Sequence, residues 1–178
     1  MLSDIKNALV SQLGAALNMT EIGVRNCPED VWKMEVRGHK IWFVIYHSLY
    51  YVDYYGNSLD PAMENPEEQF DLSQVFENTK VPSPHFEELK EKSFLSQEIM
   101  LKYIEFLREK TNKLISNCTE EDFLEKARFH LQSINNLEMV IYFTRHVMQH
   151  IGHVSAYIRE RYDISVPWSG KWSPLNKC

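Results

Sequence analysis

Apolar residues recur at intervals of three and four residues along four long stretches of the chain, and this spacing predicts four principal helices. The predicted helices span residues 3–24, 39–55, 86–117 and 133–162. Ser3 is placed to cap the first helix, whose pattern weakens at Asn18 and continues to Val24 only if the helix bends there.

The second of these stretches, KIWFVIYHSLYYVDYY, is aromatic-rich and could also be a strand. Its apolar and polar residues alternate poorly, however, and it is much longer than an average strand of about 5–6 residues. Two helical faces are visible instead, one with Val44, His47, Tyr51 and Tyr54 and the other with Trp42, Ile45 and Leu49. A buried helix that ends at Gly56 is therefore predicted.

The segments between these helices complete the predicted fold. Residues 56–84 are rich in Asn, Asp, Pro and Glu with little periodicity, which is typical of an elaborated crossover. Short helical turns are predicted around Trp32 and over 123–129, and the tail after Tyr162 is expected to carry two tryptophans back over the helices. The predicted fold class is all-α, a four-helix bundle with a long crossover connection, with residues 1–178 in a single domain.

Charge and cysteine content exclude several classes of function. The net charge is −6 and no run of Lys and Arg exceeds two residues, which argues against nucleic-acid binding. The three cysteines are scattered and odd in number, so neither a disulfide framework nor a cysteine zinc site is predicted. No signal peptide and no apolar run of about 20 residues is visible. We therefore expect a soluble cytoplasmic protein with no nucleic-acid and no membrane partner.

The strongest chemical signal is a row of histidines in the last predicted helix, in the sequence RHVMQHIGH. At about 100° per residue, His150 lies about 40° to one side of His146 and His153 about 20° to the other. All three therefore point in nearly one direction, beside a fully apolar stripe. Buried imidazoles need partners, and two histidines at i and i+4, or at i and i+3, can bind one metal ion.

A further histidine, His47, lies on an apolar face of the second predicted helix. Taken alone, such a residue is more often a satisfied core histidine than a ligand. Together with two histidines of the last helix it would provide three imidazoles around one cation, an open arrangement typical of catalytic sites. A metal held there would lower the pKa of water towards about 7 or hold a thiol as thiolate. Spacing alone leaves open which two of the three histidines join His47, and the remaining ones, His39, His85 and His130, are expected to be ordinary surface residues.

These motifs resemble a known family. The segments FVIYHSLYYVDYY and RHVMQHIGH are similar to the DinB/YfiT superfamily of small bacterial four-helix-bundle proteins, which has a lone histidine on its second helix and an HxxxHxG signature on its last. The matching positions here are His47, His146, His150 and Gly152. The PEDVWK turn and the Trp/Pro-rich tail also resemble the family, so the similarity covers nearly the whole chain. Many members have Gln after the glycine, where this chain has His153.

The resemblance implies a divalent metal ion, most often zinc or nickel, held by His47, His146 and His150 in a bundle that is frequently a homodimer. It leaves His153, Tyr51 and Tyr54 as candidates to line the site around these ligands. Characterised relatives include thiol-dependent S-transferases and a mycothiol-dependent isomerase. The predicted function is that of a metal-dependent enzyme acting with a small-molecule substrate, a low-molecular-weight thiol, as an S-transferase does.

Three alternatives fit the same residues. The metal could activate water, which would make the protein a metal-dependent hydrolase. The chain could be a non-catalytic, metal-stabilised bundle that serves as a binding protein. Haem held between His47 and His146 is a third reading, although no CxxCH attachment motif is present. Because ligand imidazoles must be neutral, metal affinity is expected to fall as pH drops through about 6.

Overall fold

A computed structural model of the chain describes residues 1–36, 38–64, 94–128 and 133–172. This part is mostly helical, which confirms the predicted all-α class. In chain order the elements are α1 (Leu2–Asn26), α2 (Glu29–Trp32), β1 (Glu35–Val36), β2 (His39–Lys40), α3 (Ile41–Gly56), the short 3₁₀ turn η1 (Asn57–Leu59), α4 (Gln97–Asn117), α5 (Glu120–Leu124) and α6 (Asn136–Tyr162).

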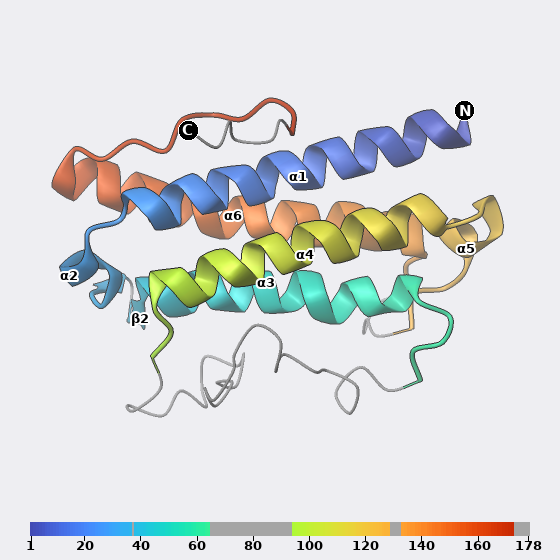
Figure 1. Cartoon of the computed structure of the whole chain (residues 1–178), viewed down its shortest axis with the longest axis horizontal. Coiled ribbons are helices and arrows are strands. Elements are labelled where there is room, and N and C mark those ends of the chain that lie inside the picture. Colours follow the sequence, from blue (N-terminus) through green and yellow to red (C-terminus); the bar gives the residue numbers. More distant parts are fainter. Residues whose placement is uncertain (37, 65–93, 129–132, 173–178) are drawn as a thin grey trace.

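Within the described residues, the long helices α1, α3, α4 and α6 lie side by side (Figure 1). Helix α1 packs against α4 and α6, and α3 packs against the same two helices. The strands β1 and β2 form a minimal antiparallel pair just before α3, with Glu35 opposite Lys40. This arrangement brings the histidine of α3 next to those of α6.

Burial explains why α3 forms without an obvious polar face. Its residues Ile41 to Tyr46 are all buried, and so are Leu49, Val52 and Asp53 further along the helix. Helix α6 has the opposite character, since a single apolar stripe from Met139 to Ile158 is buried while its other residues after Asn136 are half-buried or exposed. The helix predicted over 39–55 is confirmed, with bounds of Ile41 and Gly56.

The helix ends differ from the sequence-based predictions. Ser3 lies inside α1, and the carbonyl of Met1 accepts the first hydrogen bonds of the helix, from Asp4 and Ile5. Helix α4 begins at Gln97 after an N-cap at Ser96. Residues 94–96, which were predicted to be helical, are therefore outside the helix. Residues 65–93, which include most of the predicted crossover, lie outside the described part.

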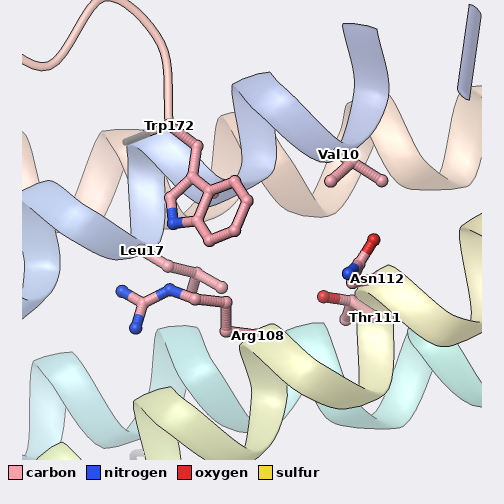
Figure 2. Close-up of a pocket in the computed structure, with 7 residues that line it drawn as sticks. Val10, Leu17, Arg108, Thr111, Asn112 and Trp172 are labelled. Carbon is pink, nitrogen blue, oxygen red and sulfur yellow. The ribbon is translucent and has the colours of Figure 1, made fainter. Parts of the chain in front are cut away.

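The segment after α6 runs back along α1, as predicted (Figure 1). Only one of its two described tryptophans, Trp172, packs against α1. The Trp172 backbone N–H donates to the Ser11 carbonyl over 3.0 Å, and the Trp172 ring lies over Gly14. This ring lines a cavity of about 20 Å³ between α1 and α4, together with Arg108 and other residues of the two helices. Figure 2 shows Trp172 and Arg108 in this cavity. Trp168, in contrast, is 74% exposed.

Replacing Gly14 by alanine is expected to displace Trp172 from α1. A Cβ atom at position 14 would lie 2.5 Å from the Trp172 Cγ atom, close to the indole's attachment rather than at its far end. Alanine has a helix propensity about 1 kcal/mol more favourable than glycine. This gain offsets the lost packing of Trp172, so the melting temperature should change little. Acrylamide quenching of tryptophan fluorescence should nevertheless increase, and a Trp172→Phe background should abolish that increase.

Gly152→Ala is the matched control for this experiment, because a Cβ atom at position 152 would meet nothing within 4 Å. This variant should gain stability from helix propensity and leave the quenching unchanged. Equal stabilisation by both substitutions, with unchanged quenching in both, would show that Trp172 does not need the space at Gly14.

Candidate metal centre

Three of the predicted site residues converge where α3 meets α6. His47 comes from α3, while His146 and His150 come from consecutive turns of α6. Their candidate ligand nitrogens all lie within 4.8 Å of one another. The ring centroid of His47 is 5.2 Å from that of His146 and 4.9 Å from that of His150. The structure thus brings together the three residues that the sequence singled out, and this triad could hold a metal ion.

The local sequence explains the placement of the two α6 histidines. Val147 and Ile151 are buried in the apolar stripe of α6, and His146 and His150 precede them by one residue each. This offset holds both imidazoles half-buried at the edge of the stripe, facing α3. His47 is likewise half-buried, between the buried residues Tyr46 and Ser48.

The separation of the two α6 rings suits a shared ion. The Nε2 atoms of His146 and His150 are 3.0 Å apart. Two nitrogens bound to one zinc ion at about 2.0–2.1 Å are separated by about 2.9–3.4 Å when the angle at the metal is about 90–110°. The pair therefore already has the spacing of two ligands of one ion.

The surroundings of the two α6 histidines favour the neutral form, which is the form that binds metal. Burial, with a smaller contribution from nearby His47, lowers the pKa of His146 to about 4. Burial and the neighbouring imidazoles lower the pKa of His150 to about 3. Both imidazoles therefore bind protons less readily than an ordinary imidazole does, which leaves their nitrogens available to a metal ion.

One nitrogen of the triad is buried without a hydrogen-bond partner among the described residues. This atom is Nδ1 of His146. Buried polar nitrogens normally have partners, so an orphaned one marks either a functional site or an interaction with an absent group. The other ring nitrogen of His146, Nε2, lies within hydrogen-bond distance of Nε2 of His150.

Compared with family models, with curated proteins and with solved structures, the chain matches none. The likeness to the DinB/YfiT superfamily therefore rests on the motifs alone. Among the described helices, none has an apolar stretch long enough to cross a membrane.

Tyrosines line the triad on the side of the α3 carboxyl end. The Tyr51 ring contacts His47 and His146 edge-on, with centroid distances of 4.9 and 5.5 Å. Burial raises the pKa of Tyr51, so its hydroxyl stays protonated. Tyr54, the other predicted tyrosine, packs against Tyr50, Tyr51 and Tyr55. Of the two candidates, Tyr51 is thus the one seen in contact with the triad.

The remaining histidines have varied positions. His153 is exposed on α6, with its ring centroid 6.4 Å from that of His150, and it does not belong to the triad. His39 is half-buried in β2 rather than fully on the surface. His85 and His130 lie outside the described residues.

A second polar cluster lies between α3 and α4 and was not predicted as a site. The Asp53 carboxylate is 1% exposed and accepts hydrogen bonds from the Lys110 ammonium and from the Tyr103 hydroxyl. Lys110 also donates to the Asn57 side-chain oxygen over 2.6 Å. Burial raises the pKa of Asp53, and the Lys110 charge opposes that rise. The cluster is a buried ion pair whose sequence signal was Asp53, the one residue of α3 that is Asp, Glu, Lys or Arg.

Proposed function

We propose that the chain is a DinB-like four-helix bundle with a long crossover, and that it binds one divalent metal ion, zinc or nickel, through His47, His146 and His150. We further propose that it is a metal-dependent enzyme acting on a low-molecular-weight thiol, in the manner of an S-transferase. The observation that supports this most is the convergence of three imidazoles from two helices, with their ligand nitrogens within 4.8 Å of one another.

The ligand set favours an anionic substrate atom. Three neutral imidazoles leave the charge of a divalent ion uncompensated, and the triad found among the described residues includes no carboxylate. A bound metal ion supplies Lewis acidity and holds a thiol in its thiolate form, the nucleophilic state. The protein's own contribution is to present three unprotonated nitrogens and to leave a coordination position free for the substrate.

Metal content provides the first test. Protein purified without added metal should contain close to one divalent ion per chain by elemental analysis. The His150→Ala variant should lose most of that metal on dialysis, because two imidazoles hold the ion less well than three. His153→Ala is the matched control, since it removes an exposed histidine from the same helix, and it should keep the metal. Full retention by His150→Ala would contradict the proposal.

Turnover separates transfer from hydrolysis. A chloro-dinitroarene with added cysteine or glutathione as the thiol should give a conjugate with the metal-loaded protein, and none without the thiol. Cleavage of a nitrophenyl ester without any thiol would favour the hydrolase alternative. A metal that raises the melting temperature while neither substrate reacts would favour the non-catalytic bundle. The homodimer implied by the resemblance belongs to the same proposal, and analytical sedimentation of the metal-loaded chain tests it.

A further inference from the structure

In the metal-free chain His146 has a hydrogen-bond contact through Nε2, which lies 3.0 Å from Nε2 of His150. A metal ion bound by both Nε2 atoms would replace this contact, and the orientation of His146 then needs another explanation. A metal-binding histidine almost always donates its second ring N–H to a carboxylate, a carbonyl or water, and this bond fixes the ring. The second ring nitrogen of His146, Nδ1, is buried and has no partner among the described residues. Some other contact must therefore hold this ring in place for a metal.

Three tyrosines and His146 form a closed circuit of ring contacts. Tyr51 meets His146 edge-on at a centroid distance of 5.5 Å and stacks on Tyr55 at 5.3 Å. Tyr55 in turn meets Tyr142 edge-on at 5.6 Å. Tyr142 lies nearly parallel to His146, with an interplanar angle of 11° and a centroid distance of 6.4 Å. Each ring of the circuit thus contacts two others.

The circuit joins the two helices that supply the metal ligands. Tyr51 and Tyr55 belong to α3, whereas Tyr142 and His146 belong to α6. The Tyr55 and Tyr142 side chains are also joined by a hydrogen bond. Tyr51 reaches a second ligand as well, because its ring meets that of His47 at 4.9 Å and 71°. Aromatic pairs at such distances contribute about 0.5–1.5 kcal/mol each beyond their buried area, which is enough to restrict the rotation of a ring.

We propose that Tyr51, Tyr55 and Tyr142 are positioning residues of the metal centre, whose packed rings orient His146 in place of the hydrogen bond that usually does so. This inference rests on the proposed binding of a metal ion by His47, His146 and His150. It assigns the effect of Tyr51 to its ring and not to its hydroxyl, because both of its contacts with the triad are ring contacts.

Cobalt(II) is a suitable probe, because its visible absorption reports ligand geometry and its affinity can be measured by competition with a chelator. Removal of a group that orients a ligand typically costs 10–100-fold in metal affinity. Tyr51→Leu should therefore weaken cobalt binding by at least about tenfold and change the visible spectrum. Tyr51→Phe, which keeps the ring, should retain the affinity and the spectrum of the unmodified chain.

Tyr157→Leu is the matched control, since Tyr157 is a half-buried tyrosine of α6 whose ring contacts Tyr162 and Arg161 and no member of the circuit. It should bind cobalt like the unmodified chain. The melting temperature of each metal-free variant shows whether it is folded. If Tyr51→Leu does not fold, Tyr142→Leu and Tyr142→Phe form an equivalent pair, because Tyr142 contacts His146 from the other helix.

The outcomes separate the positioning role of the tyrosines from the proposed metal binding on which it rests. If the unmodified chain binds no cobalt, the proposed metal centre itself is wrong. If the unmodified chain binds cobalt and a folded Tyr51→Leu variant has the same affinity and spectrum, the positioning role is overturned while the metal centre stands. An equal loss in Tyr157→Leu would also overturn it, because the effect would then come from the general packing of tyrosines and not from contact with His146.

Discussion

Replacing Lys110 by methionine should destabilise the chain by about 3 kcal/mol at neutral pH, near the low end of the range for breaking a buried ion pair. Methionine preserves most of the side-chain volume but removes the positive charge next to Asp53. The Asp53 carboxylate would then keep only the Tyr103 hydroxyl, 3.1 Å away, as a donor in a site where it is 1% exposed. The low end of the range applies because the Lys110 side chain is itself 22% exposed.

The pH dependence of this effect identifies its cause. Without Lys110 the opposing positive charge is gone, and the pKa of Asp53, already raised by burial, should rise further. A carboxyl group whose pKa is raised in the folded state gains stability as pH falls from that value towards the unfolded value. The deficit of Lys110→Met relative to the unmodified chain should therefore shrink in acid.

Urea unfolding of the metal-free chain at pH 7 and pH 5 measures both effects. Lys113→Met is the matched control, because Lys113 is exposed on the same helix, and it should change the unfolding free energy by no more than about 0.5 kcal/mol. Combining Lys110→Met with Asp53→Asn should recover much of the loss, since the introduced amide is neutral. If Lys110→Met alone is as stable as Lys113→Met, water already solvates Asp53 in the folded chain.

The periodicity of the sequence was sufficient to locate the long helices, because core packing requires each to present an apolar face. It could not locate their ends. Ser3 has the right side chain for an N-cap, yet the chain is already helical there and Met1 provides the first carbonyl. Capping depends on how the chain enters the helix, which tertiary contacts determine.

The candidate site could be predicted as far as local spacing reaches. His146 and His150 are one turn apart, so their proximity follows from the helix alone. Their approach to His47 depends on how α3 packs on α6, which was expected from the apolar face of His47 and from the family resemblance. The contacts of Tyr55 with Tyr142, and of Asp53 with Lys110, depend on the relative register of two helices. Periodicity within one helix carries no information about that register.

Metal-free protein should lose stability as pH falls below about 6.5, the usual pKa of an unfolded histidine. In the folded chain the pKa of His146 is about 4 and that of His150 is about 3, mainly because both rings are buried. Between these values and about 6.5 the unfolded chain binds protons that the folded chain does not. The stability contributed by the neutral rings is therefore full above pH 6.5 and is lost progressively towards pH 3. The slope of the unfolding free energy against pH corresponds to the uptake of up to two protons on unfolding.

The His150→Leu variant isolates this effect from the carboxyl groups that also titrate in acid. It should lower the slope of unfolding free energy against pH by up to one proton between pH 6.5 and pH 4, because leucine takes up none in either state. Met148→Leu replaces a half-buried residue of the same helix that binds no proton in either state, and it should leave the slope unchanged. Urea unfolding with a chelator present, at intervals of half a pH unit, gives both slopes. Equal slopes in the unmodified chain and His150→Leu would mean that His150 is protonated as readily in the folded chain as in the unfolded one, which would contradict this prediction.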